Sequence, residues 1–108
     1  MSTIYYKGMQ NGFSAFTGFE WDDGNREKNL KHGVHASECE QVFFNEPIVV
    51  LDDPRHSMEE ERFAAFGRTD QGRRLMVVFT RRGSRVRVIS ARDMSRRERE
   101  FYENTTED

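Results

Sequence analysis

The spacing of apolar residues changes near residue 48. Before this point, capping residues bracket two segments of helical character, whereas residues 1–18 show no sustained periodicity. From residue 48 onward, short apolar and β-branched runs alternate with turn residues, which is typical of strands. The pattern predicts helices in the first half of the chain and a hairpin-connected sheet in the second, followed by one more helix.

Three helices are predicted from capping signals. They run from a cap at Asp22 or Asp23 to about Lys31, from Ser37 to about Phe44, and from Ser95 to about Glu103. A glutamate follows each of the two serines by three residues, which is the spacing of a capping box. Gly33 stands where a helix C-terminus takes a left-handed residue, so His32 lies in the last turn of the first helix.

Six strands are predicted from alternating or β-branched runs. They are Ile4–Lys7, Phe19–Trp21, Ile48–Leu51, Arg62–Arg68, Leu75–Thr80 and Arg85–Arg92. Asp70–Gly72 and Arg82–Ser84 have the composition of hairpin turns. Because Leu75–Thr80 is apolar on both faces, we expect it in the centre of the sheet. The order predicts a compact α+β domain, an antiparallel meander with two N-terminal helices and one C-terminal helix.

Length and composition fit one domain with a modest core. The chain has 108 residues, of which 35% are hydrophobic, and two full domains would need more. No apolar stretch approaches the length of a membrane span and no signal peptide is visible, so we expect a cytoplasmic protein. Cys39 is the only cysteine, which excludes an internal disulfide. We expect it to be a small buried hydrophobe.

The net charge of -2 hides a strong segregation. Residues 1–61 carry five basic side chains against twelve acidic ones, whereas residues 62–99 carry twelve arginines and no lysine against three carboxylates. Arginine offers a planar fork of donors that grips phosphate and stacks on bases, so this bias favours contact with phosphate or nucleic acid. The alternative is that these arginines pair with the acidic half of the same chain.

The arginines occupy alternating positions in two predicted strands. Arg62 and Arg68 share one face of their strand, and Arg85 and Arg87 share one face of another. If the two faces coincide, the sheet presents a cluster of guanidinium groups suited to phosphates and stacked bases. Alternatively, they spread over a solvated face or bridge to the glutamates at 59–61. The arginines at strand ends, where grooves often form, are Arg81, Arg82 and Arg92.

The three histidines differ in context. His32 could move a proton near neutral pH, or could simply cap the first helix. His35 and His56 lie in turn-like segments, where we expect them to be solvated, and the spacing of the three histidines matches no zinc template. We therefore expect no metal and no cofactor. The sequence also has no phosphate-binding glycine loop and no nucleophile elbow.

Several strings, taken together in their order and spacing, resemble the BrnT family of toxins. They are Phe19-Glu20-Trp21-Asp22, Asn29, Lys31-His32-Gly33-Val34, Glu61-Arg62-Phe63, Phe66-Gly67-Arg68, Arg87-Val88-Ile89-Ser90-Ala91-Arg92 and Ser95-Arg96-Arg97-Glu98 with Tyr102. The resemblance covers residues 19–103, which leaves residues 1–18 as an N-terminal extension and 104–108 as an acidic tail. It implies a RelE-like fold.

The resemblance also implies an activity and partners. The protein would be the toxin of a type II toxin–antitoxin pair, a ribonuclease of the mRNA interferase type that needs no metal and arrests growth by cutting RNA. Its partner would be a BrnA-like ribbon-helix-helix antitoxin, through which alone the toxin would contact operator DNA. No membrane contact is implied. The alternative from a different class is a non-catalytic module that binds RNA or a protein partner.

Within this hypothesis, the candidate residues fall into two groups. The group expected to act on the reacting phosphate comprises His32 or Glu61 as base, Arg62, Arg87 and Arg92 as charge stabilisers, and Tyr102 near the site. The group expected to bind the RNA backbone comprises Lys31, Arg68, Arg81, Arg82 and Arg85. Arginine stays protonated, so it can stabilise negative charge but is a poor base.

Overall fold

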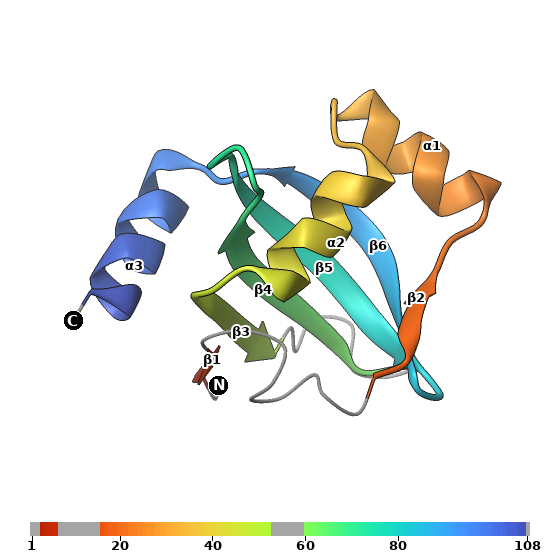
Figure 1. Cartoon of the computed structure of the whole chain (residues 1–108), viewed down its shortest axis with the longest axis horizontal. Helices are drawn as coiled ribbons and strands as arrows, with labels where there is room; N and C mark the ends of the chain where they lie inside the picture. The colour runs from red at the N-terminus through yellow and green to blue at the C-terminus, as the bar shows by residue number, and fades with distance from the viewer. Residues whose placement is uncertain (1–2, 7–15, 53–59, 108) are drawn as a thin grey trace.

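The computed structural model in Figure 1 describes residues 3–6, 16–52 and 60–107. Its elements are β1 (Thr3–Tyr6), β2 (Gly18–Glu20), α1 (Asp23–Lys31), α2 (Ala36–Phe44), β3 (Ile48–Asp52), β4 (Arg62–Arg68), β5 (Arg74–Arg82), β6 (Arg85–Asp93) and α3 (Arg96–Thr106). Every predicted helix and strand is present, and the α+β class is confirmed. His56 lies outside the described residues.

The strands form one six-stranded sheet in the order β1-β3-β4-β5-β6-β2. Neighbouring strands from β1 to β6 are antiparallel, as the meander predicts. The pairing of β2 with β6 is parallel, which corrects the expectation of a purely antiparallel sheet. β1 and β2 are consecutive in the chain but lie at opposite edges of the sheet, so the N-terminal segment contributes to both borders.

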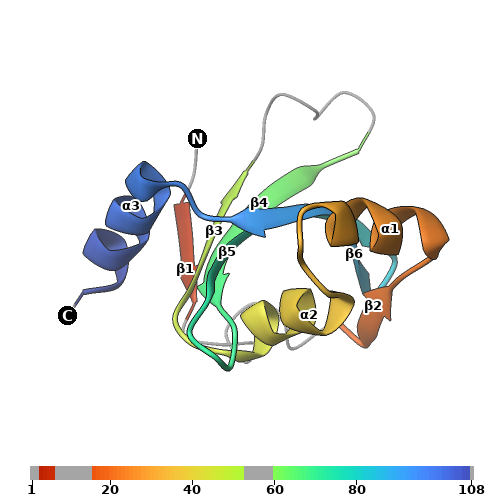
Figure 2. The ribbon, with the colours of Figure 1, turned by 90° about the horizontal axis from the view of Figure 1, so that it is seen from above.

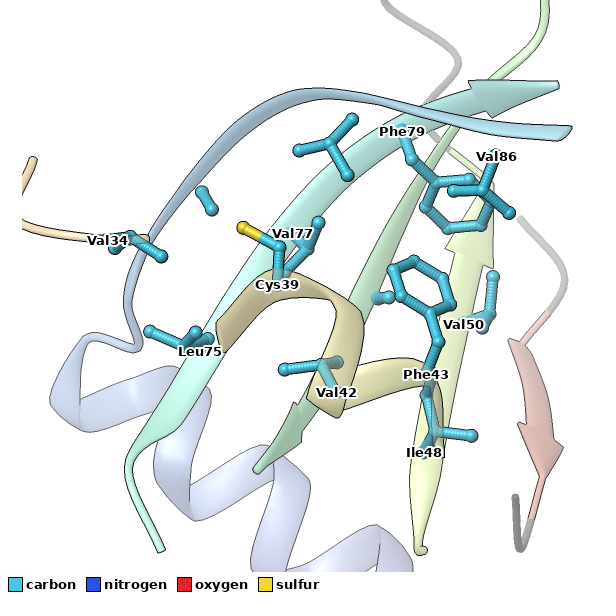
Figure 3. Packing of buried hydrophobic residues seen from close by; sticks show 13 residues of the cluster. Val34, Cys39, Val42, Phe43, Ile48, Val50, Leu75, Val77, Phe79 and Val86 are labelled. Atoms are coloured by element: carbon cyan, nitrogen blue, oxygen red, sulfur yellow. The ribbon is translucent and has the colours of Figure 1, made fainter. Parts of the chain in front are cut away.

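Helices pack against both faces of the sheet (Figure 2). On one side, which we call the α2 face, side chains from α2 and the strands form a dry apolar cluster (Figure 3). Phe43 of α2 meets Phe79 of β5 edge to face, with ring centroids 5.0 Å apart. Cys39 is fully buried in this cluster, as expected, and burial raises the pKa of its thiol to about 12.

On the opposite side, which we call the α3 face, a smaller cluster lies under α3. It joins Tyr102 to Val49, Phe66 and Met94. β5 contributes to both sides, because Leu75 packs in the α2-face cluster while Met76 packs against the α3-face cluster. The predicted central, two-sided strand is therefore confirmed.

Two helix boundaries differ from the predictions. α2 begins at Ala36, and the Glu38 carboxylate accepts a hydrogen bond from the His35 backbone N–H at 3.0 Å, in place of a cap at Ser37. α3 starts after Ser95, as predicted, but continues to Thr106 rather than ending near Glu103. In the described ranges, no helix is long and apolar enough to cross a membrane.

Candidate functional site

A row of polar residues crosses four strands on the α3 face. Arg62 of β4 pairs with Thr80 of β5, Thr80 pairs with Arg87 of β6, and Arg87 pairs with Glu20 of β2. Residues directly opposite one another across a sheet point to the same face. The condition on which the guanidinium cluster depends, that the two arginine-bearing faces coincide, is therefore met for Arg62 and Arg87. Because adjacent strands lie about 4.8 Å apart, the backbones of Arg62 and Arg87 are roughly 10 Å apart.

The Arg87 guanidinium is held by two carboxylates. Its Nη1 lies 2.9 Å from Oε1 of Glu20, and its Nη2 lies 2.9 Å from Oδ2 of Asp22. Burial works against the charged form of Arg87, but the hydrogen bonds to Asp22 and Glu20 outweigh it and raise the pKa of Arg87. The Asn25 backbone N–H, followed by the Arg87 guanidinium, holds the pKa of Asp22 below its ordinary value. Arg87 is thus charged and fixed in place.

Arg62 has a different environment. Its Nε is buried without a hydrogen-bond partner, and within 3–6, 16–52 and 60–107 no carboxylate forms an ion pair with it. The neighbouring Glu61 is exposed, and its backbone carbonyl accepts a hydrogen bond from Thr80 Oγ1 at 2.6 Å. Arg62 therefore brings to the row a positive charge that no carboxylate of the described ranges neutralises.

Three more predicted RNA-binding arginines surround the turn between β5 and β6. Arg82 lies 3.4 Å from Glu60 and 3.8 Å from Glu20, so it is partly neutralised. Arg81 stacks over the ring of Phe16 at 5.5 Å, and Arg85 is exposed beside the row. The turn therefore carries guanidinium groups next to Arg87.

Arg92 lies away from the row. It pairs across the sheet with Met76, four residues along β5 from Thr80, which corresponds to about 13 Å at 3.3 Å per residue. Its guanidinium forms two hydrogen bonds with the carboxylate of Glu98, at 2.7 and 2.9 Å. Hydrogen bonding to Arg92 lowers the pKa of Glu98. Arg92 is thus anchored at the start of α3, apart from Arg62 and Arg87.

Tyr102 is completely buried under α3. Its hydroxyl donates a 2.6 Å hydrogen bond to the backbone carbonyl of Pro47, and burial raises its pKa. The side chain therefore fastens α3 to the segment before β3, and no part of it reaches solvent, where a substrate would bind. This is a packing role, in contrast to the expected place near the reacting groups.

Arg68 lies at the opposite end of β4 from Arg62. Its Nε is buried without a partner. The residue borders an open depression of about 500 Å³ beside the end of α2, whose lining includes Phe44 and Asp70. Six residues of extended chain, about 20 Å, separate Arg68 from Arg62, so the two arginines do not form one cluster.

Lys31 and His32 lie at the far end of α1 from Arg87. Asp22, which contacts Arg87, caps the first turn of α1, whereas Lys31 is its last residue. The nine helical residues between these ends span about 14 Å. His32 caps the helix through its backbone, donating to the Asn29 carbonyl at 3.0 Å. The structure therefore does not bring His32 next to Arg62 and Arg87.

The alternative, pairing of arginines with the chain's own carboxylates, holds for six of the twelve arginines between 62 and 99 when only the described residues are considered. Those with ion pairs are Arg73, Arg74, Arg82, Arg87, Arg92 and Arg96. Glu20 belongs to the row and Asp22 lies beside it, but neither was among the predicted site residues. Only the parallel pairing of β2 with β6 places them beside Arg87. Among the described residues, no three His, Cys, Asp or Glu side chains gather as a metal site.

Comparison with known families decides what kind of protein carries this row. The family described as "Ribonuclease toxin, BrnT, of type II toxin-antitoxin system" matches residues 21–98. The chain belongs to the BrnT family. A search among curated proteins found no match.

The BrnT match covers most of the row. Arg62, Thr80 and Arg87 lie within residues 21–98, as does Asp22 beside the row, whereas Glu20 lies one residue before the match and Tyr102 lies beyond it. The family is one of ribonuclease toxins, whose type implies an RNA substrate and an antitoxin partner. The α+β architecture is consistent with the RelE-like fold that the resemblance implies.

Proposed function

We propose that this BrnT protein is an endoribonuclease of the mRNA interferase type, which cuts RNA on the α3 face without a metal ion. The observation that carries the proposal is the row itself. The guanidinium of Arg62, which has no ion pair among the described residues, and the fixed guanidinium of Arg87 stand on one face, two strands apart. Two such groups can supply the positive charge that phosphoryl transfer requires.

The proposed reaction is attack by a ribose 2′-OH on the adjacent phosphorus. The 2′ oxygen forms a bond to phosphorus, the bond from phosphorus to the 5′ oxygen breaks, and the products end in a 2′,3′-cyclic phosphate and a 5′-OH. Arg62 and Arg87 stabilise the negative charge that builds up on the phosphate oxygens. A base accepts the 2′-OH proton, and an acid returns one to the 5′ oxygen.

Glu61 is our first candidate for the base. Its exposed carboxylate belongs to the residue next to Arg62, whereas His32 lies at the far end of α1 from Arg87. Arg92, held by Glu98, lies about 13 Å along the sheet from Arg87. At this distance it would contact another phosphate of the same RNA chain rather than the reacting phosphate. The flanking RNA backbone would contact Arg81, Arg82, Arg85, Arg68 and Lys31.

We further propose that a BrnA-like ribbon-helix-helix antitoxin neutralises the toxin and mediates its contact with operator DNA. Covering the α3 face near Arg62 would suffice, because that guanidinium has no carboxylate of its own within the described ranges. Cleavage would take place in the cytoplasm, where messenger RNA is translated.

Cleavage of labelled RNA by the purified protein in excess EDTA tests the proposal. We expect products with 2′,3′-cyclic phosphate ends, and we expect Arg62→Ala to lower kcat about 100- to 1,000-fold, the usual cost of losing one transition-state donor. Arg96→Ala is the matched control, because Arg96 is 88% exposed and pairs only with Glu100 in its own helix. This control variant should stay within about twofold of the natural protein.

The same assay separates the competing function. RNA binding that weakens steeply with salt, in the absence of any cleavage by the natural protein, would favour the non-catalytic module. Cleavage that disappears in EDTA and returns with a divalent cation would contradict the metal-independent reaction. Full cleavage by Arg62→Ala would contradict the proposed role of Arg62 in the reaction.

A further inference from the structure

We propose that Glu20 and Asp22 are positioning residues that hold the Arg87 guanidinium in one orientation, and that Asp22 couples this orientation to the start of α1. The inference rests on the proposed ribonuclease function, in which Arg87 stabilises charge on the reacting phosphate. It explains why two carboxylates lie beside Arg87, although their negative charge weakens the attraction of the α3 face for RNA.

The parallel pairing of β2 with β6 delivers both carboxylates to Arg87. Glu20 stands opposite Arg87 in the register, and Asp22 follows two residues later. Each carboxylate takes a different terminal nitrogen of the guanidinium, at 2.9 Å. A guanidinium has five N–H donors, so two contacts fix its plane and about three donors remain for a phosphate.

Asp22 connects Arg87 to α1 through its second oxygen. Oδ1 accepts the backbone N–H of Asn25 at 3.0 Å, and the Asn25 side-chain oxygen accepts the backbone N–H of Asp22 at 2.7 Å. The Asn25 amide also donates to the carbonyls of Glu20 and Val88, at 3.1 and 2.9 Å. One network therefore joins the start of α1, the end of β2 and the middle of β6.

This network matters because no apolar side chain within α1 itself is buried. Its buried residues are Asn25 and Asn29, and the exposed residues include Leu30. Helices in proteins usually owe their stability to packing of an apolar face. Besides the flanking Trp21 and Val34, which pack on the α2-face cluster, polar contacts hold α1 in place. The ion pair between Asp22 and Arg87 is one of them, so a shift of α1 would move a ligand of Arg87.

Two carboxylates on one guanidinium make the local charge negative, so they oppose the binding of RNA in its ground state. Their benefit comes later, when the phosphate gains further negative charge and needs donors that are already oriented. Removing one carboxylate charge should therefore have opposite effects on two steps. RNA should bind as tightly or more tightly, while the chemical step slows.

Asp22→Asn and Glu20→Gln test this prediction. Asparagine caps helices about as well as aspartate, so Asp22→Asn removes the charge while keeping the cap. We expect kcat to fall about tenfold in each variant and about 100-fold in the double variant, with KM unchanged or lower, because small losses of alignment cost this much. Asp23→Asn is the matched control: it removes a charge one residue away and should leave both constants within about twofold.

A double variant whose kcat equals or exceeds that of the natural protein would overturn the inference. So would an equal loss of kcat in Asp22→Asn and Asp23→Asn, since that would indicate a general effect of charge. A rise in KM together with a lower melting temperature would indicate a merely structural role and would also contradict it.

Nuclear magnetic resonance of the arginine side chains gives a second readout that does not depend on cleavage. In the natural protein, the Nη groups of Arg87 should give separate signals because two carboxylates restrict rotation, and these signals should average in the double variant. Signals that stay separate would refute the positioning role. Full cleavage by Arg87→Ala would instead refute the place of Arg87 in the proposed function, whatever the spectra show.

Discussion

The two faces of the sheet differ in how their side chains are packed. On the α2 face, alternate strand residues and α2 form a dry cluster in which Phe43, Val77 and Phe79 have almost no exposed surface. On the α3 face, apolar packing is confined to the part under α3, and the remainder carries the row from Arg62 to Glu20. The comparison teaches that the larger apolar core lies on one side of these strands and the proposed catalytic row on the other.

The difference follows from alternation along each strand. In β4, Phe63 and Ala65 face α2, whereas Arg62 and Ala64 face the other side. Substitutions on the two faces should therefore affect different measurements: the free energy of unfolding on the α2 face, and cleavage at the open end of the α3 face.

The largest effect on stability should come from Phe43→Ala. This ring is fully buried against Phe79, so its loss should lower the free energy of unfolding by about 3–5 kcal/mol. Phe44→Ala is a matched control, because the adjacent ring is 61% exposed and should cost less than about 1 kcal/mol. Urea denaturation followed by circular dichroism measures both. Equal costs would contradict the burial of Phe43 in the α2-face cluster.

Gly67→Ala should have the next largest effect. A Cβ at this position would lie 2.8 Å from Cγ1 of Val42, so strand and helix would have to separate, at a cost of about 1–3 kcal/mol. Adding Val42→Ala removes the methyl group in the way, so the two substitutions should cost less together than the sum of their separate costs. Strict additivity in urea denaturation would show that α2 does not pack this closely on β4.

Tyr102→Phe should lower the free energy of unfolding by about 1 kcal/mol, because it removes the hydrogen bond to the Pro47 carbonyl. RNA cleavage should remain within about twofold of that of the natural protein, since the hydroxyl is buried. Thermal unfolding and the cleavage assay measure the two effects. A stable variant that no longer cuts RNA would show that the Tyr102 hydroxyl takes part in the reaction.

The smallest effect should be a pH dependence centred on Arg73. This residue pairs with Asp93 and with Glu38, and its hydrogen bond is the main reason why the pKa of Asp93 lies below its ordinary value. A lowered pKa stabilises the fold above the ordinary pKa of about 3.9 and loses this contribution as the pH falls through the folded-state value.

Arg73→Gln should therefore unfold more easily at pH 7, and its stability should fall less between about pH 5 and pH 2. Partly exposed pairs contribute up to about 1 kcal/mol each, so the difference is small but measurable in urea denaturation at several pH values. Parallel stability curves for the variant and the natural protein would contradict the role of this ion pair.

Local signals in the sequence accounted for most of the fold. The capping box at Ser95, the glycine after α1 and the alternation in β4 and β6 each act within a few residues, and each element is where the pattern predicts it. The predicted start of α2 at Ser37 was wrong, because two glutamates could each complete a capping box at the start of this helix. Glu38 bonds the His35 N–H, while Glu40 accepts from the Trp21 indole at 2.8 Å and is not available to Ser37.

The candidate site was less predictable, because its contacts are distant in sequence. The shared face of Arg62 and Arg87 follows from alternation once the hairpins are placed, but the sequence alone left open whether the two faces coincide. Glu20 lies 67 residues before Arg87, and only the parallel pairing of β2 brings them together. The sequence marked Asp22 as a helix cap, but gave no sign that its second oxygen would meet an arginine.

The Asn25 amide has a consequence for how molecules of this protein can assemble. β2 pairs with β6 only as far as Arg87, and the next carbonyl along, that of Val88, is already occupied by Asn25. An unpaired strand border is a template on which another chain can add by backbone pairing. Here the Asn25 side chain occupies one acceptor of that border at Val88, so a second chain that extended the sheet past this point would compete with the docking of α1.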